Sequence, residues 1–178
     1  MQIGLIGLGK MGAQIARRLH KKGHKVIAWN RSLEPRADFR RFGGRTAETV
    51  EELVSALPRR KIIWVMLPSG QTTEEMLERL RGLLRPDDII IDGSNSFYED
   101  TIRRAKLLAK RKIHFFDAGT SGGVWGEKNG FAIMVGGPKK IWPRVRPIFK
   151  DLAVHSLPLS PSGRGSCLLY TSPSPRDS

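Results

Sequence analysis

Three glycines near the amino terminus, Gly7, Gly9 and Gly12, have the spacing of a turn that can hold a phosphate group. They follow a short apolar stretch and open a segment in which apolar residues recur at helical spacing. In such a G-x-G-x-x-G turn the first glycine makes the turn, the second lets the backbone approach a pyrophosphate, and the third lets the helix pack closely against a sheet. The N–H groups at the start of the helix then face the phosphates. We therefore expect a dinucleotide site here, which includes Lys10 and Met11.

Asn30, Arg31 and Ser32 come directly after a second apolar stretch, where the ribose of the dinucleotide would lie. Proteins specific for NAD usually place an Asp or Glu here, which accepts a hydrogen bond from the ribose 2′-hydroxyl. A carboxylate would repel a 2′-phosphate, whereas the Arg31 guanidinium can bind one with two charge-assisted hydrogen bonds. Asn30 and Ser32 add donors around it. We therefore predict NADP as the cofactor; Glu34, one turn later, leaves NAD possible, and Arg31 could instead be a solvent-facing loop residue.

Two further polar turns could bind a substrate: Asn95 within Asp-Gly-Ser-Asn-Ser, and the run Ser121, Gly122 and Gly123. An asparagine offers both a donor and an acceptor, which suits a polyhydroxy compound. A Ser-Gly-Gly turn after a strand is small and bare, and it can present donors to an anion. Taken singly, each could be an ordinary turn, with Asn95 capping the next helix. Together, at strand ends of one dinucleotide fold, they predict a substrate site.

These residues must be positioned by short apolar strands that alternate with amphipathic helices. We expect strands over 2–6, 25–29, 61–66, 89–91, 113–116 and 131–135. We expect helices over 10–22, 34–41, 47–56, 71–84, 98–111 and 138–151, the fourth of them capped by Thr72 or Thr73 with Glu75. This alternation predicts an α/β fold with a Rossmann-type, doubly wound, mostly parallel sheet. Ligands bind outside the carboxyl ends of such strands, at the loops 7–12, 30–33, 67–71, 92–97 and 117–127.

The composition limits the class of protein. The 178 residues are 39% hydrophobic, which is enough for one domain with its own core. No stretch is long and apolar enough for a membrane span and no signal peptide is visible, so we expect a cytoplasmic protein without a membrane partner. The single cysteine, Cys167, excludes an internal disulfide, and the four histidines lack metal-ligand spacing, so we predict no metal site.

The net charge of +14 could indicate a nucleic-acid-binding protein. The Lys and Arg residues are, however, spread over several expected helices, and no RNA-binding motif accompanies them. We interpret them as solvated helix faces that give a general attraction for phosphorylated ligands, and we expect no nucleic-acid partner. Trp125 and the methionines are interpreted as packing residues.

The last stretch of the chain, residues 166–178, has neither helical nor strand periodicity. Read back into codons, Cys167 to Asp177 match the translated end of a sequencing-library adapter. We therefore expect a dinucleotide-binding domain over 1–165 and a non-native tail over 166–178, which we leave out of the fold prediction. The chain would then be a fragment of a longer protein.

Taken in order, the motifs at 7–12, 30–32, 92–101, 119–126 and 134–137 resemble one family. They are similar to the N-terminal cofactor-binding domain of the decarboxylating 6-phosphogluconate dehydrogenases, over about residues 1–165. The form Gly-Thr-Ser-Gly-Gly-Val-Trp-Gly resembles the shorter bacterial and archaeal branch of that family.

The resemblance implies an oxidoreductase of the pentose phosphate pathway. In that family the 3-hydroxyl of 6-phosphogluconate is oxidised: the hydride on C3 passes to NADP and the hydroxyl proton is released, CO2 is lost, and ribulose 5-phosphate is formed. It implies that Asn95 contacts substrate and nicotinamide, that the turn at 121–123 holds the sugar acid near its carboxylate, and that Leu67 and Pro68 pass beside the cofactor. The family's catalytic lysine and glutamate, and the helical domain of its homo-oligomer, lie beyond this point. We therefore place no catalytic residue in this chain and expect it to be inactive by itself.

Two other functions stay open. A β-hydroxyacid dehydrogenase of the 3-hydroxyisobutyrate or tartronate-semialdehyde type shares the glycine turn, the Asn-Arg pair and the Ser-Gly-Gly turn. Those relatives usually have Ser-Thr where this chain has Asn95. A non-catalytic basic module that binds a cofactor or nucleic acid is the other. As a nucleic-acid-binding module it would need a positive stripe with stacking aromatic residues on one face.

Overall fold

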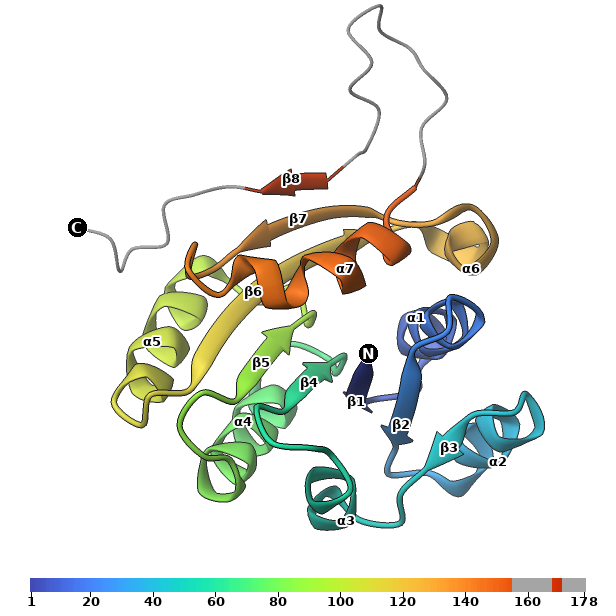
Figure 1. Ribbon diagram of the computed structural model, residues 1–178, viewed down its shortest axis with the longest axis horizontal. Helices are drawn as coiled ribbons and strands as arrows, with labels where there is room; N and C mark the ends of the chain where they lie inside the picture. Colours follow the sequence, from blue (N-terminus) through green and yellow to red (C-terminus); the bar gives the residue numbers. More distant parts are fainter. Residues whose placement is uncertain (155–167, 171–178) are drawn as a thin grey trace, which may run out of the picture.

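The chain forms one sheet of eight strands (Figure 1). The expected ligand-binding loops follow the carboxyl ends of its strands. The computed structural model describes residues 1–154 and 168–170. The strands are β1 (Gln2–Ile6), β2 (Lys25–Trp29), β3 (Arg45–Thr46), β4 (Ile62–Val65), β5 (Ile89–Asp92), β6 (His114–Ser121), β7 (Ala132–Gly136) and β8 (Leu168–Tyr170). They lie in the order β3-β2-β1-β4-β5-β6-β7-β8.

The strand order is that of a dinucleotide-binding sheet. β1 pairs in parallel with β2 on one side and with β4 on the other, and β5 and β6 continue in parallel. The order therefore reverses between β1 and β4, which is the switch point where ligands bind in such folds. β7 runs antiparallel to β6. The predicted α/β, doubly wound, mostly parallel sheet is confirmed.

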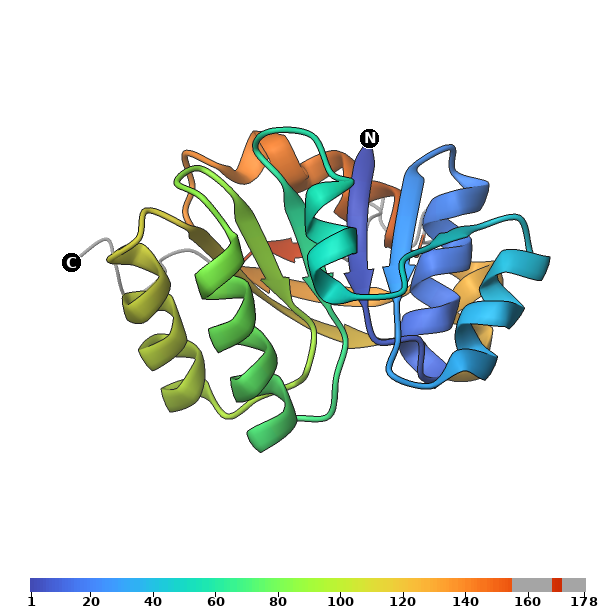
Figure 2. The same ribbon diagram turned by 90° about the horizontal axis from the view of Figure 1, so that it is seen from below.

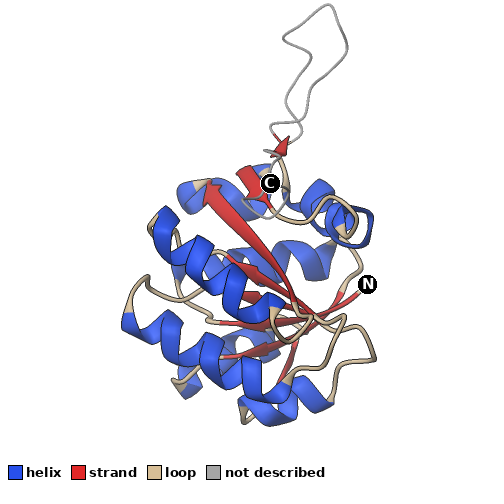
Figure 3. Ribbon diagram, turned by 90° about the vertical axis from the view of Figure 1, so that its left-hand side faces the viewer, coloured by secondary structure: helices blue, strands red, loops and turns tan. Residues whose placement is uncertain are grey.

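Helices cover both faces of this sheet, as Figures 2 and 3 show. They are α1 (Lys10–Lys21), α2 (Leu33–Arg41), α3 (Val50–Ser55), α4 (Gln71–Leu83), α5 (Tyr98–Ala109), α6 (Gly126–Asn129) and α7 (Trp142–Leu152), with a 3-10 turn at Gly123–Trp125. On one face α1, α2 and α7 bury residues such as Leu19 and Phe149 in a single cluster. On the other face α3, α4 and α5 form a second cluster around Leu53 and Leu80.

Most expected elements are present, and each of three differences has a physical cause. The first two strands have the predicted boundaries. β6 continues past residue 116 to Ser121 because β7 pairs with its second half. β3 and α6 were not expected, since two and four residues show too little periodicity. The predicted cap of the 71–84 helix is wrong: Gly70 is the N-cap without a capping side chain, and Thr73 donates its hydroxyl to the carbonyl of Pro68.

Three arginines expected on solvated faces are buried, which corrects that interpretation. Arg18, Arg36 and Arg104 each expose 6% of their surface or less. Arg18, for example, donates to the carbonyls of Asp151 at 2.9 Å and Ala153 at 3.3 Å. A buried guanidinium is tolerated when its donors are satisfied in this way.

Two residues interpreted as packing residues lie on the surface instead. Trp125 is 64% exposed and Met134 is 59% exposed. In the segment expected to be a tail, β8 pairs in parallel with β7, while Cys167 lies outside the described residues. The domain boundary at residue 165 stays a prediction. No helix among the described residues has the length and apolar composition of a membrane span.

Candidate functional site

The glycine turn between β1 and α1 is tightly confined. Gly7 has a φ of +101°, and a Cβ there would lie 2.2 Å from the carbonyl oxygen of Met66. A Cβ on Gly12 would lie 1.9 Å from the carbonyl oxygen of Gly7. A Cβ on Gly9, in contrast, would meet no atom within 4 Å. Gly7 and Gly12 therefore shape the turn, whereas Gly9 leaves open space above the backbone.

The start of α1 fits the pyrophosphate of a dinucleotide. Gly9 is the N-cap, no side chain caps the helix, and its first turn carries no acidic residue. The uncapped N–H groups and the positive end of the helix dipole favour an anion there. Lys10 is exposed at this end, and Met11 is partly buried against the core.

Asn30 joins the glycine turn to the loop that follows β2. Its Oδ1 accepts a hydrogen bond from the backbone N–H of Leu8 at 2.9 Å, and its Nδ2 donates to the carbonyl of Ser32 at 3.3 Å. Because these bonds engage both ends of the amide, Asn30 shapes the site from within the protein. Arg31 and Ser32 are exposed beside it, and among the described residues the Arg31 side chain makes no polar contact.

The loop after β4 lies across the switch point from the glycine turn. The Leu67 Cδ2 is 3.0 Å from the position that a Cβ on Gly7 would take. Pro68 is exposed, and its carbonyl accepts the hydroxyl of Thr73 at 2.8 Å. The structure therefore places Leu67 and Pro68 next to the turn that would hold the cofactor.

Asn95 and Ser121 line one groove at the carboxyl edge of the sheet. Asn95 is exposed and has a left-handed backbone conformation, with a φ of +54°. It borders two adjoining cavities of about 340 and 370 Å³, which also share Gly119 and Met134. Ser121 lines the first cavity and Asp117 lines the second. The groove follows the face of β6 and β7 on which these residues are paired.

Gly122 and Gly123 follow Ser121 but line neither of these two cavities. A Cβ on Gly122 would lie 2.6 Å from the ring of Phe131, so this glycine is needed for packing. Gly123 opens the 3-10 turn that leads to α6 and has open space above its Cα. Of the three residues in this turn, only Ser121 faces the groove with Asn95.

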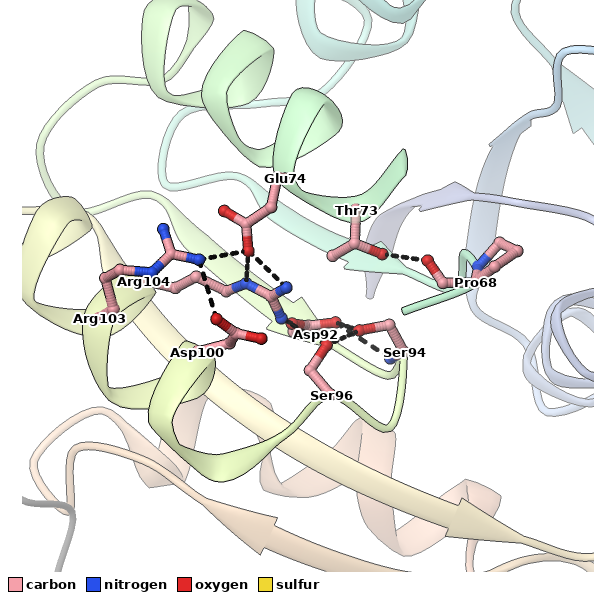
Figure 4. Close-up of polar contacts among 9 residues, drawn as sticks. All are labelled: Pro68, Thr73, Glu74, Asp92, Ser94, Ser96, Asp100, Arg103 and Arg104. Atoms are coloured by element: carbon pink, nitrogen blue, oxygen red, sulfur yellow. Dashed lines mark hydrogen bonds and ion pairs between the residues drawn. The ribbon is translucent and has the colours of Figure 1, made fainter. Parts of the chain in front are cut away.

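A network of buried polar side chains lies behind Asn95, as Figure 4 shows. Asp92, at the end of β5, is fully buried and accepts a hydrogen bond from Nη1 of Arg104 at 2.9 Å. The Nε of Arg104 donates to Glu74 on α4 at 2.7 Å, and its Nη1 also contacts the hydroxyl of Ser96. One guanidinium on α5 thus contacts α4, the end of β5 and the turn that contains Asn95.

Sequence reasoning missed two residues of this region, Arg104 and Asp117. Arg104 shares the buried face of α5 with Ala105 and Leu108, and this helical spacing was a signal that could have found it. Asp117 ends the part of β6 that pairs in parallel with β5. A carboxylate at a strand end was therefore the available signal for Asp117.

The carboxyl group of Asp117 has an unusual affinity for its proton. The pKa of Asp117 is raised from its usual 3.8 to about 6, mainly by burial and also by the nearby Asp92 carboxylate, while the Arg104 guanidinium acts in the opposite direction. Asp92 and Asp117 are register partners in β5 and β6, which explains their repulsion. A group that titrates near neutral pH therefore lies in the groove beside Asn95.

Asp117→Asn is expected to stabilise the domain at alkaline pH. The unfolded chain releases this proton around its usual pKa of 3.8, but the folded chain only at about 6. Ionisation of Asp117 thus costs the folded state stability as the pH rises through this window. The variant should gain about 1 to 2 kcal/mol at about pH 8 and little at about pH 4, after allowance for solvent screening.

Urea unfolding at the two pH values measures this difference in free energy. Glu34→Gln removes one negative charge from an exposed position and is the matched control. An equal gain for Asp117→Asn at both pH values would show that the pKa of Asp117 is not raised.

The arrangement can bind two ligands at neighbouring places. The glycine turn and the start of α1 can hold a pyrophosphate, and the groove can hold a small hydroxy acid. The lining of the groove contains Asp117 as its single titratable side chain. Within residues 1–154 and 168–170, no three His, Cys, Asp or Glu side chains lie close enough together to hold a metal ion.

The strand order and the glycine turn define a dinucleotide-binding domain of the Rossmann class. The model of one family, the NAD binding domain of 6-phosphogluconate dehydrogenase, matches residues 2–164. The chain belongs to this family of oxidoreductase domains.

Known relatives agree with this assignment. The NAD(+)-dependent, decarboxylating 6-phosphogluconate dehydrogenase of Haloferax volcanii is 38% identical over 165 residues, which are 93% of this chain and 52% of that protein. The Plasmodium falciparum 6-phosphogluconate dehydrogenase, solved in its apo form and with NADP+ and 6-phosphogluconate, superposes with a TM-score of 0.84 at 29% identity, over 96% of this chain and 36% of its own. The 3-hydroxyisobutyrate dehydrogenase of Mycobacterium tuberculosis superposes with a TM-score of 0.78 at 26% identity, over 85% and 51%. The chain therefore spans about half of these relatives or less.

Proposed function

We propose that the chain is the cofactor-binding part of an enzyme that oxidatively decarboxylates 6-phosphogluconate to ribulose 5-phosphate with NADP. The observation that carries this proposal is the position of the groove of Asn95 and Ser121. It lies at the carboxyl ends of the strands, as does the glycine turn that follows β1. The bound nicotinamide supplies the hydride acceptor. Asn95 offers a donor and an acceptor to the hydroxyl groups of the substrate, and the Ser121 hydroxyl donates a hydrogen bond to the carboxylate of the substrate. We further infer that the intact enzyme is a cytoplasmic homo-oligomer.

The chain alone is proposed to bind the cofactor without turnover. Oxidation of a hydroxyl needs a base that takes its proton. The lysine and glutamate that the family resemblance implies are not among the residues that line the groove. The carboxyl group that does line the groove, Asp117, lies four residues along β6 from Ser121 on the same face, so it is not beside the proposed carboxylate site.

The test is to titrate the purified chain with NADPH and then to supply 6-phosphogluconate and NADP+. We expect NADPH binding, no formation of NADPH from substrate, and NMR signal changes at Asn95 and Ser121 on addition of 6-phosphogluconate. Absence of NADPH and NADH binding would contradict the cofactor site. Formation of NADPH would contradict the proposed inactivity.

A β-hydroxyacid dehydrogenase is the second candidate, because the M. tuberculosis 3-hydroxyisobutyrate dehydrogenase shares the fold at 26% identity. The same NMR titration with 3-hydroxyisobutyrate separates the two. Signal changes at Asn95 and Ser121 with this compound, and none with 6-phosphogluconate, would favour the second candidate.

Arg31→Ala is expected to weaken NADP+ binding about tenfold while changing NAD+ affinity less than about twofold. The reason is that the exposed Arg31 guanidinium can contact the 2′-phosphate, which NAD+ lacks. Lys110→Ala removes a charge at the far end of α5 and should change neither affinity. Equal losses for the two dinucleotides would show that Arg31 does not recognise the 2′-phosphate.

A further inference from the structure

The turn that presents Asn95 is held on both sides by one buried ion pair. Arg104 and Asp92 expose 2% and 0% of their side chains, and Nη1 lies 2.9 Å from Oδ2. Burial of two charges is costly, and such a pair often serves specificity of structure more than stability. This pair therefore raises the question of what it positions.

The contacts of the pair lead directly to the residues on either side of Asn95. Asp92 Oδ1 accepts hydrogen bonds from the backbone N–H of Ser94 at 3.0 Å and from its hydroxyl at 2.6 Å. The Ser94 hydroxyl lies 2.7 Å from that of Ser96, which also contacts Arg104. Asn95 itself is exposed with a φ of +54°, a conformation that non-glycine residues adopt only when their surroundings impose it.

The Arg104 guanidinium also contacts α4, the helix that follows the loop of Leu67 and Pro68 beside the proposed cofactor. Nε of Arg104 donates to Glu74, and the adjacent residue on α4, Thr73, donates to the carbonyl of Pro68. Figure 4 shows two sets of contacts that meet at neighbouring residues of α4: Thr73 with Pro68, and Glu74 with Arg104, which continues to Asp92 and Ser96. The first turn of α4 therefore contacts the loop after β4 directly, and it reaches the turn at 94–96 only through Arg104.

We propose that Arg104 is a positioning residue that holds the turn at 94–96 so that Asn95 projects into the groove. The inference rests on the proposed function for the role of Asn95 toward substrate, but the geometry of the turn can be tested without ligand. Arg104 is not among the residues that line the groove. It acts through Asp92, Ser96 and Glu74.

The test compares Arg104→Met with Arg103→Met in the full chain. Arg103 is the matched control, because it pairs with Glu74 and Asp100 but with neither Asp92 nor Ser96. The backbone ¹³C shifts of Asn95 report its left-handed conformation. We expect Arg104→Met to move them towards ordinary values and to weaken 6-phosphogluconate binding about tenfold or more, while NADPH affinity changes less than about twofold. Equal shifts in both variants, or none in Arg104→Met, would overturn the proposal.

Arg104→Lys keeps the inference testable if the methionine variant does not fold. A lysine retains the charge beside Asp92 but cannot span Asp92, Ser96 and Glu74 together. We expect this variant to fold with the Asn95 signals still displaced. Complete return of these signals would show that charge balance is the whole role of Arg104.

Failure of this inference differs from failure of the proposed function. If wild-type chain does not respond to 6-phosphogluconate, the proposed substrate is wrong, yet the Asn95 shifts of the unliganded variants still decide the role of Arg104. If wild-type chain responds and the variants respond equally well with unmoved Asn95 signals, the role of Arg104 is wrong and the proposed function stands.

Discussion

Gly12→Ala is expected to destabilise the whole domain by about 3 kcal/mol, which lowers Tm by roughly 10 °C in a chain of this size. The added methyl group would lie 1.9 Å from the carbonyl oxygen of Gly7, which is backbone and cannot rotate away. The helix α1 must therefore move off β1 and β4, and its buried residues Ile15 and Leu19 lose contacts in the core. This loss exceeds the roughly 1 kcal/mol that alanine gains over glycine in a helix.

Gly82→Ala is the matched control for this prediction. Gly82 lies within α4, and a Cβ there would meet no atom within 4 Å. It should therefore gain about 0.5 to 1 kcal/mol from helix propensity alone. Thermal and urea unfolding of the two variants measure the difference, and a Gly12→Ala variant as stable as Gly82→Ala would contradict the close approach of α1 to the turn.

The parts of the fold that depend on local sequence could be predicted. β1 and β2 have the expected boundaries, because each is a largely apolar run that is followed directly by a residue with strong turn preference, Gly7 or Asn30. The end of α1 is also local, since Gly23 follows it with a φ of +84°. In all these cases the pattern of a few neighbouring residues contains the whole signal.

The parts that depend on distant partners were missed. β6 extends to Ser121 only because β7 returns beside it, and nothing within the strand marks that extension. From the sequence, Arg104 cannot be distinguished from the other cations of this basic chain. Its partners Asp92 and Glu74 are 12 and 30 residues away, and only the fold brings them next to it. Trp125 was expected in the core because tryptophan usually packs, yet the described residues leave it exposed.

The candidate site also has one part that local sequence predicts and one part that depends on how distant strands pair. The glycine turn lies within six consecutive residues, so its spacing alone predicts that the helix packs closely at Gly12, and in the structure this close approach is to the carbonyl of Gly7. Asn95 and Ser121 meet only because β5 and β6 are neighbours in the sheet, which the general rule for parallel sheets suggested but the residues themselves did not specify.

Gly9→Ala is expected to leave the fold intact and to remove cofactor binding. Gly9 is the N-cap of α1 with φ −68° and ψ −171°, a conformation that alanine adopts freely, and its Cβ would meet no atom within 4 Å. The free energy of unfolding should therefore fall by no more than about 1 kcal/mol, which is the preference of an N-cap for glycine over alanine. The methyl group would instead occupy the space through which a pyrophosphate reaches the N–H groups of α1.

We expect the dissociation constants of NADPH and NADH to rise at least about a hundredfold in this variant, which is about 3 kcal/mol of binding free energy. Titration of NADPH fluorescence, with unfolding curves of the same samples, measures both quantities. Together the variants separate the two roles in the turn: Gly12→Ala should strongly lower stability, and Gly9→Ala should strongly lower affinity with only a small loss of stability. If Gly9→Ala binds NADPH like the wild-type chain, the dinucleotide does not lie over this turn, and the proposed cofactor site is wrong although the fold is right.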